Sequence, residues 1–406
     1  MADAGLSERA AARSRLHPLA WPWWAQSLAI FALTRIPTTW LLLDAAGRQQ
    51  ANSFTGAAPG YAEFATIWDG AWYERIAEHG YPGQLPIDEA GHVGENAWAF
   101  MPVYPAVVRL LMLLTGLPYD GLAVAVAVAC GAGAAVVLHR LLLDVLPAGT
   151  AAFAVLLFCV APVSPLLQLG YAESMFALLL GVALLLVQRG LLLPAFPVVA
   201  MLAITRPGAL PLALALVLVW LLRHRRQRRE GAPFPTAERW RLGALAVWSG
   251  CWGLVWLAAA AIGTGSLTAY TDTELAWRSA YIGRQELVPF TPWFQGAQWW
   301  VGDVLGPVAL LLLLALIAVA LLSPAVRRLG PLLVAWTVSY GLYLLAVWFP
   351  QSSTFRILLP AFPALGAVAV PRSPWVRVPL VAACLAGQWL WIESCWLIVG
   401  ADWTVP

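Results

Sequence analysis

Long apolar stretches recur along this chain, and they constrain its fold more than any other feature. Runs of roughly 20 residues with few or no charges, the length that a helix needs to cross a bilayer, recur from Trp23 to Val399. The residues are 61% hydrophobic and 11% charged, whereas a soluble domain has about 25% charged residues. A soluble fold of 406 residues with this composition lacks the polar side chains to cover its surface. The sequence therefore predicts an all-α, multi-pass membrane protein.

Hydropathy divides the chain into eleven expected membrane spans, which together form a single membrane domain over residues 1–406. A further apolar segment, 100–116, is short and carries Arg109 in its middle. We expect it to lie at the outer interface or to re-enter the bilayer rather than to cross it. The spans are expected at residues 23–43, 119–139, 150–168, 172–188, 190–206, 207–222, 242–262, 302–322, 331–349, 356–370 and 375–398.

The distribution of arginine predicts the orientation of the spans. All 24 basic residues are Arg, and seven of them lie in residues 223–241. Because cytoplasmic loops are enriched in basic residues, this segment is expected inside. Counting spans in both directions then places 16 of the 24 Arg inside, together with the N-terminus. The C-terminus and the loops 44–118, 263–302 and 348–356 are expected outside.

The N-terminal segment and the cysteines give further expectations about processing and location. Arg9, Arg13 and Arg15 precede the first apolar run, and no small-residue cleavage site follows it, so we expect an uncleaved first span. The five cysteines lie in apolar runs without a close CxxC pair, so neither a disulfide nor a zinc site is expected. The expected location is a bacterial plasma membrane, with the functional face outside.

The stretch WDGAWYERIAEHGYP, residues 68–82, is the most informative for chemistry. It predicts a short helix from about Asp69 to Glu78, which Gly80 and Pro82 end.

Trp68, Trp72 and Ile76 recur every four residues and form one apolar stripe on this helix. We expect the helix to rest on the membrane surface with its aromatic side chains toward lipid and Asp69 near the headgroups. In one interpretation Asp69 only stabilises the helix N-terminus. In the other, it accepts a proton from a hydroxyl group of a lipid-linked substrate.

Three further motifs follow in order: AFMPVYPAVVRLL at 99–111, LGYAESMFALL at 169–179 and ITRPGAL at 204–210. Together the four resemble the WDxxxYxxIAxxGY, FxPLYPxLxRxL, YSESLFALL and TRxxG signatures of the second mannosyltransferase of GPI-anchor synthesis (phosphatidylinositol glycan class V) and its bacterial homologues. Ala172 stands where that family usually has Ser. The likeness runs from about residue 25 to 365.

This resemblance implies a GT-C glycosyltransferase with a catalytic acid in its first external loop. The expected reaction is inverting transfer of mannose from polyprenyl-phosphate mannose to a hydroxyl group of a lipid or glycan acceptor. It implies that Asp69 is the general base. No cofactor or metal is expected to be required, and the expected partners are membrane lipids, the polyprenyl-phosphate sugar and a glycolipid or glycan acceptor, with no nucleic acid.

Further substrate-binding candidates come from position and motif. Glu173 lies at the outer mouth of two spans, where it either serves function or caps a helix. Arg206 and Arg356 lie at outer span ends, where they either bind a lipid phosphate through a bidentate fork or extend toward the headgroups. The full set of predicted binding residues is Trp68, Trp72, Tyr73, Tyr104, Arg109, Tyr171, Glu173, Arg206 and Arg356.

Several other polar residues have less defined expectations. Arg35, deep in the first span, is expected to have a structural partner, such as a carboxylate, or to contact substrate. The spacing of His79 and His92 fits no metal template. The basic run at 223–231 sets topology or binds anionic lipid. Four residues of the second external loop are expected to shape the acceptor site: Asp272, Glu274, Trp277 and Arg278.

Two other functions remain open from the sequence. A transporter or flippase of lipid-linked sugars would show internal repeats and charges at the membrane midplane, whereas the ionisable residues here gather at the outer face. A non-catalytic subunit of an envelope-assembly complex would use the helix at 69–78 for docking.

Overall fold

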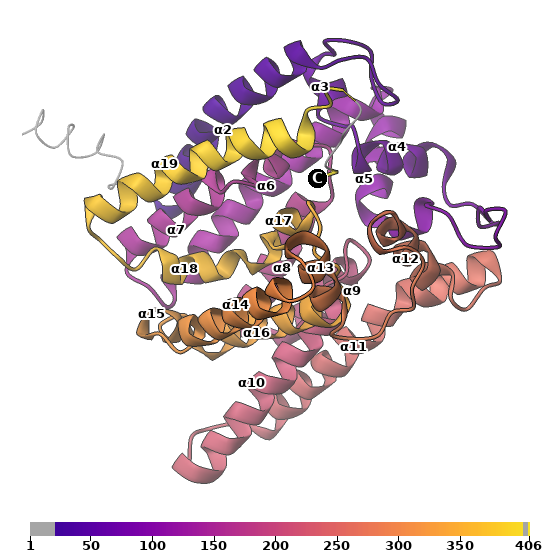
Figure 1. Ribbon diagram of the computed structural model, residues 1–406. Helices are drawn as coiled ribbons and strands as arrows, with labels where there is room; N and C mark the ends of the chain where they lie inside the picture. Colours follow the sequence, from indigo (N-terminus) through magenta and orange to yellow (C-terminus); the bar gives the residue numbers. More distant parts are fainter. Residues whose placement is uncertain (1–20, 401–404) are drawn as a thin grey trace, which may run out of the picture.

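The computed structural model describes residues 21–400 and 405–406. Their regular secondary structure is helical apart from one isolated bridge between Ile87 and Val93, and loops connect the helices (Figure 1). The predicted all-α fold class is confirmed. The basic N-terminal segment with Arg9, Arg13 and Arg15 lies outside the described residues.

The helices follow the predicted order of apolar segments closely. In chain order the elements are α2 (Trp23–Arg48), α3 (Tyr61–Phe64), α4 (Asp69–His79), η2 (Ala97–Ala99), α5 (Val103–Thr115), α6 (Tyr119–Leu143), α7 (Ala148–Val160), η3 (Ser164–Gln168), α8 (Glu173–Gln188), α9 (Leu192–Ala203), α10 (Ala209–Glu230), α11 (Thr236–Thr264), α12 (Ala269–Ile282), α13 (Pro292–Val301), α14 (Leu305–Leu321), α15 (Pro324–Arg327), α16 (Gly330–Val347), α17 (Thr354–Ile357), η4 (Leu359–Ala364), α18 (Leu365–Val368), α19 (Pro374–Trp391) and η5 (Ile392–Trp396).

Among the described residues, five helical stretches are long and apolar enough to cross a membrane: α2, α6, α11, α16 and Pro374–Trp396. Together with the shorter apolar helices they make this a multi-pass membrane protein. The other predicted spans correspond to shorter or more charged helices, so the count of eleven stays a prediction. Proline accounts for part of the shortening, because Pro162 follows the end of α7 and Pro360 and Pro363 interrupt the segment after α17.

The segment that was expected not to cross the membrane contains α5. Its 13 residues extend about 20 Å at 1.5 Å per residue, less than the roughly 30 Å hydrocarbon core. However, α7 and α9 are no longer, with 13 and 12 residues. Helix length alone therefore does not separate α5 from its neighbours, and the interfacial placement stays a prediction.

Small residues bring the central helices α6 and α8 close together. A Cβ atom on Gly133 of α6 would lie 3.1 Å from the Leu178 side chain, and one on Gly181 of α8 would lie 3.0 Å from Val137. Close approach through glycine is typical of helices that pack inside a membrane. Helices α2 and α7 pack on α6 as well. This rigid centre carries the start of α8, at which Glu173 lies.

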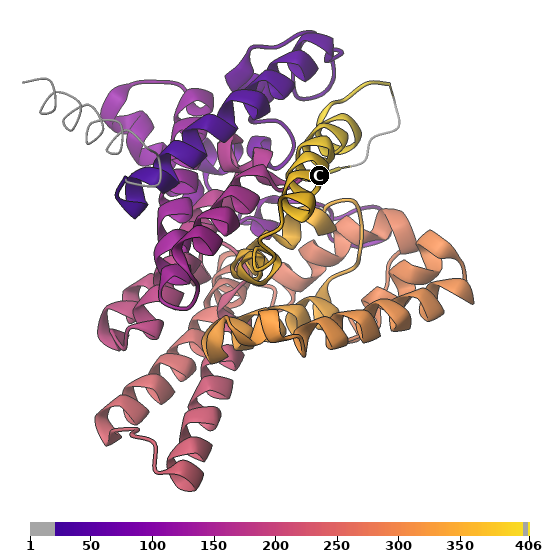
Figure 2. The ribbon, with the colours of Figure 1, turned by 90° about the vertical axis from the view of Figure 1, so that its left-hand side faces the viewer.

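Helices α10 and α11 form a hairpin that projects from the rest of the molecule in both views (Figures 1 and 2). Its end carries the arginine run that was expected to be cytoplasmic. Arg223 pairs with Glu238 across the hairpin, and Trp220 donates a hydrogen bond to the carbonyl oxygen of Arg239 at 3.1 Å. These contacts hold the two helices together at their basic end.

Candidate active site

Asp69 is the first residue of α4, and the residue before it has a strained backbone. Trp68 has φ 59° and ψ −121°, in a region that L residues rarely adopt. Its indole donates a hydrogen bond to the Trp396 carbonyl oxygen at 3.1 Å, and its ring packs 5.1 Å from the Phe54 ring. Strain of this kind persists where the surroundings hold a residue in place, commonly at functional sites. These contacts fix the position of Asp69.

The predicted helix at 69–78 is confirmed as α4, which ends at His79 before Gly80 with φ 77°. The expectation that its aromatic stripe faces lipid is wrong. The Trp68 side chain is buried against protein, and the Trp72 ring stacks on Phe100 with centroids 5.7 Å apart. The apolar stripe instead attaches α4 to the rest of the protein.

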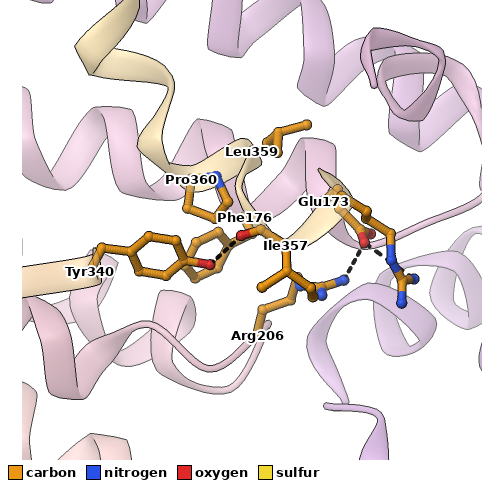
Figure 3. Close-up of a pocket in the computed structure, with 8 residues that line it drawn as sticks. Glu173, Phe176, Arg206, Tyr340, Ile357, Leu359 and Pro360 are labelled. Carbon is orange, nitrogen blue, oxygen red and sulfur yellow. Dashed lines mark hydrogen bonds and ion pairs between the residues drawn. The ribbon is translucent and has the colours of Figure 1, made fainter. Parts of the chain in front are cut away.

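Two carboxylates and two guanidinium groups form an ion-pair cluster beside α4. Arg356 of α17 pairs with Asp69, and its Nη1 lies 3.5 Å from Oε1 of Glu173. Arg206, in the turn between α9 and α10, pairs with the same oxygen of Glu173 (Figure 3). The sequence places all four residues at outer helix ends, and the structure brings them together. With two negative and two positive groups, the cluster is neutral.

This cluster is largely shielded from solvent. The exposed fraction of the side chain is 2% for Glu173, 8% for Arg356, 12% for Asp69 and 15% for Arg206. Both carboxylates occupy the first position of a helix, where unpaired backbone N–H groups favour negative charge. Buried charges are tolerated when they are paired. An anionic ligand that engages Nη1 of either arginine therefore competes with a carboxylate for it.

Tyrosine side chains pack around the start of α4, close to Asp69. The Tyr171 hydroxyl accepts a hydrogen bond from the Asp69 backbone N–H at 3.0 Å, and Arg356 lies 5.3 Å above the Tyr171 ring. Tyr73 packs edge to face on Tyr104 at 5.2 Å, and Tyr104 donates to the Ala123 carbonyl oxygen at 2.8 Å. Tyr171 thus contacts the cluster directly, whereas Tyr104 packs against Tyr73.

The segment before α8 passes very close to the segment before α4. The Gly170 N–H donates to the Ala65 carbonyl oxygen at 2.8 Å. A Cβ atom on Gly170 would lie 2.6 Å from Cγ2 of Thr66. Only glycine permits this approach, which sets the separation between Asp69 and Glu173.

A small pocket opens at one side of the cluster. About 10 Å³ is available to the centre of a water molecule, which is room for about one water. Tyr340 bounds it and donates a hydrogen bond to the Ile357 carbonyl oxygen at 2.6 Å (Figure 3). The residues around the pocket are Glu173, Phe176, Arg206, Tyr340, Arg356, Ile357, Leu359 and Pro360.

Two predicted arginines lie outside the cluster. Arg109 donates a hydrogen bond to the Ala77 carbonyl oxygen at 2.9 Å, at the opposite end of α4 from Asp69. Eight residues of helix separate these ends by about 12 Å. Arg35 donates to the carbonyl oxygens of Ser164 and Cys159 and to the Gln168 side chain. Arg35 thus has structural partners, as one of the two interpretations expected, but they are carbonyl groups rather than a carboxylate.

The two histidines of the first predicted loop lie on the surface of the protein. Nδ1 of His79 is 3.8 Å from Oε2 of Glu78, and Nδ1 of His92 is 3.5 Å from Oδ1 of Asp88. Within the part of the chain that the structure describes, no group of three or more His, Cys, Asp and Glu residues is arranged to hold a metal ion.

Two residues at the site were not expected from the sequence. Trp396 supports Trp68, and Tyr340 bounds the pocket beside Glu173. Both lie in apolar C-terminal segments that give no local signal other than hydrophobicity.

Comparison with known proteins supports the resemblance of the motifs. Residues 48–207 match the family model described as Mannosyltransferase (PIG-V). No curated protein matches the chain. Among solved structures, ArnT from Cupriavidus metallidurans, crystallised with bound undecaprenyl phosphate, is similar at 16% identity and a TM-score of 0.48. That likeness covers 87% of this chain, which spans 63% of the ArnT chain. The segment that holds Asp69, Glu173 and Arg206 thus carries the sequence pattern of the PIG-V mannosyltransferase family.

Proposed function

We propose that this protein is an inverting glycosyltransferase of the GT-C type, with Asp69 as its general base. It transfers mannose from polyprenyl-phosphate mannose to a hydroxyl group of a lipid or glycan acceptor at the outer face of the membrane. The observation that carries the proposal is the buried cluster of Asp69, Glu173, Arg206 and Arg356. The first three of these residues lie in the part of the chain that matches a mannosyltransferase family.

The two arginines suit the phosphate of the donor. A guanidinium group presents a planar fork of N–H donors that matches two phosphate oxygens. Arg356 and Arg206 both contact Oε1 of Glu173, so one carboxylate holds the two forks near each other. The donor phosphate competes with the carboxylates for these forks.

This competition links donor binding to the base. Arg356 pairs with Asp69 in the structure. When the phosphate engages Arg356, Asp69 loses part of its ion pair and its carboxylate oxygen becomes available to an acceptor hydroxyl group. Donor binding would therefore prepare the base for proton transfer.

The chemical step then needs one carboxylate. The acceptor oxygen attacks the anomeric carbon while its proton passes to Asp69. The bond between the anomeric carbon and the phosphate oxygen breaks, and its electron pair leaves with polyprenyl phosphate from the opposite face. Arg206 and Arg356 stabilise the additional negative charge on that phosphate. Because a phosphate monoester is already a competent leaving group, this reaction needs no second carboxylic acid, unlike glycoside hydrolysis.

The proposal is tested by a transfer assay on the purified protein in lipid nanodiscs. Polyprenyl phosphates that carry mannose, glucose, galactose or arabinose are offered as donors with octyl glycosides as acceptors, and the products are identified by mass spectrometry. We expect transfer of mannose with inversion at the anomeric carbon. A lack of transfer from every donor, with donor movement across the bilayer of proteoliposomes, would support a flippase instead.

A further inference from the structure

Helix α12 brings a further carboxylate, Glu274, and a tryptophan, Trp277, close to the candidate site. It packs on η2, where Asn96 donates a hydrogen bond to Thr273 at 2.8 Å. Ala269, Thr273 and Ala276 are buried at this contact side of the helix. The contact fixes how α12 lies against the segment that follows α4.

An aromatic contact joins α12 to α4. The rings of Trp277 and Trp72 meet edge to face at 6.1 Å, and Trp277 also meets Phe100 edge to face at 6.0 Å. Glu274 lies three residues before Trp277, and Asp69 lies three residues before Trp72. Residues three apart share one face of a helix, one turn along. The tryptophan contact therefore places two carboxylates in one neighbourhood, each one turn from the aromatic pair.

Electrostatics agree with this placement. Burial raises the pKa of Glu274 to about 7, and the charge of Asp69 adds to this increase. The hydrogen bond from Tyr270 and the charges of Arg206 and Arg278 lower the pKa, by less than burial raises it. Glu274 is thus within electrostatic range of both Asp69 and Arg206, although the four-residue ion-pair cluster is already neutral without it.

The aromatic pair also carries an unsatisfied donor. The Trp277 indole N–H is buried and has no hydrogen-bond partner among the described residues. Buried donors are nearly always paired, so an orphan beside a candidate site indicates a missing acceptor. A sugar hydroxyl or ring oxygen is such an acceptor.

We propose that Glu274, Trp277 and Trp72 form a hexose-recognition subsite beside Asp69. The carboxylate accepts hydrogen bonds from neighbouring sugar hydroxyl groups, the Trp277 N–H donates one, and the Trp277 ring contacts the apolar face of the pyranose. Trp72, whose ring stacks on Phe100 and lies 4.6 Å from the Arg75 guanidinium group, holds Trp277 in place. An apolar surface with a few convergent polar groups is the usual composition of a small-molecule site. This inference rests on the proposed glycosyltransferase function and adds the residues that select its sugar.

The test uses full-length protein with Glu274→Gln, Trp277→Phe and, as a matched control, Glu286→Gln. Glu286 is an exposed carboxylate of the segment after α12. Equilibrium binding is measured with polyprenyl-phosphate mannose and with polyprenyl phosphate alone. KM is measured for the donor and for octyl mannoside as an acceptor probe. Loss of the binding preference for the sugar-bearing lipid assigns the subsite to the donor sugar, and a raised acceptor KM assigns it to the acceptor sugar.

At pH 8 we expect Glu274→Gln to weaken one of these two interactions by about tenfold or more, because hydrogen bonds to a charged group are lost. Trp277→Phe keeps an aromatic ring but loses the indole N–H and its one neutral hydrogen bond, so we expect the affected binding constant or KM to change by about threefold to tenfold. Glu286→Gln should match the wild type. Since Tyr270, Arg278, Arg206, Asp69 and Tyr343 are the titratable and charged groups around Glu274, their variants identify any other source of the pH response.

Protonation of Glu274 gives a second readout. In the wild type the affinity for sugar should fall as the pH is lowered through about 7, and in Glu274→Gln it should stay low and change little with pH. Unchanged binding, KM and pH profile in Glu274→Gln would overturn the inference. A wild-type protein that transfers no sugar would contradict the proposed function, while the binding preference still tests this subsite.

Discussion

Replacement of Arg356 tests the ion-pair cluster, because this residue joins its two carboxylates. Arg356 contacts both Asp69 and Glu173, and its side chain is 8% exposed. Arg356→Met leaves two carboxylates with one arginine, and breaking a buried pair in this way costs about 3–5 kcal/mol. Asp69→Asn with Arg356→Met restores a neutral cluster. We therefore expect the double variant to be more stable than Arg356→Met alone.

Arg356→Lys keeps the positive charge but removes the planar fork of N–H donors, so it tests the two contributions separately. The net charge of the cluster stays at zero, so we expect the protein to fold. A lysine cannot present two parallel N–H donors to a phosphate, and loss of one charge-assisted hydrogen bond is worth about 1.5–3 kcal/mol. At 1.36 kcal/mol for each factor of ten, kcat/KM for the donor should fall by about 10–150-fold.

The assays are thermal unfolding in detergent and initial rates with varied donor concentration. The same substitution at Arg328, an arginine of the segment between α15 and α16, serves as the control. Wild-type donor kinetics in both Arg356→Lys and Arg206→Lys would reject a phosphate role for the two arginines. Equal stability of Arg356→Met and the double variant would show that Asp69 and Arg356 are not energetically coupled.

Three further predictions concern the surroundings of the cluster. Arg109→Gln removes the hydrogen bonds at the C-terminal end of α4 and should lower stability by about 1–2 kcal/mol, measured by thermal unfolding, with donor KM unchanged. A raised donor KM without loss of stability would instead support a substrate-binding role for Arg109. Gly170→Ala places a Cβ 2.6 Å from Thr66 and should reduce kcat more than Gly149→Ala, whose Cβ meets nothing within 4 Å; equal activity of the two would contradict the close approach. In a background without Cys251, Gly60→Cys and Leu117→Cys should label from the outside and Arg226→Cys from the inside, and cytoplasmic labelling of Leu117→Cys would reject the assigned orientation.

The sequence predicted α4 and the four ionisable residues of the cluster for local reasons. Gly80 and Pro82 end the helix that begins at Asp69, and charged residues at the ends of apolar segments are functional candidates because lipid tolerates them poorly. The same reasoning selected Arg109, whose role in substrate binding stays a prediction. A charge within an apolar helix suggests a ligand, whereas this side chain reaches the carbonyl groups at the end of α4.

The sequence pattern could not predict which residues of the cluster pair with one another. Arg356 lies 287 residues from Asp69, and Trp396 lies 328 residues from Trp68. Periodicity relates residues one or two turns apart and says nothing about contacts at this separation. The aromatic residues of α4 were misplaced for the same reason. An apolar stripe on a helix can pack against either lipid or protein. The contacts of Trp72 with Phe100 and Trp277 show that α4 packs on protein.

The single-turnover rate of Asp69→Asn tests the central claim most directly. Asparagine keeps the shape and an acceptor oxygen for Arg356 but cannot take a proton from the acceptor hydroxyl group. Asp120→Asn is the matched control, since Asp120 also lies in the first turn of a helix and accepts a hydrogen bond from Thr66 at 2.8 Å. We predict that Asp69→Asn lowers the rate of mannose transfer by about 10²–10⁴, while Asp120→Asn stays near the wild-type rate. Donor affinity of Asp69→Asn should be at least that of the wild type, because the neutral side chain competes less with the phosphate for Arg356. Transfer by Asp69→Asn at a near wild-type rate would contradict the assignment, and Glu173 would be the next residue to test.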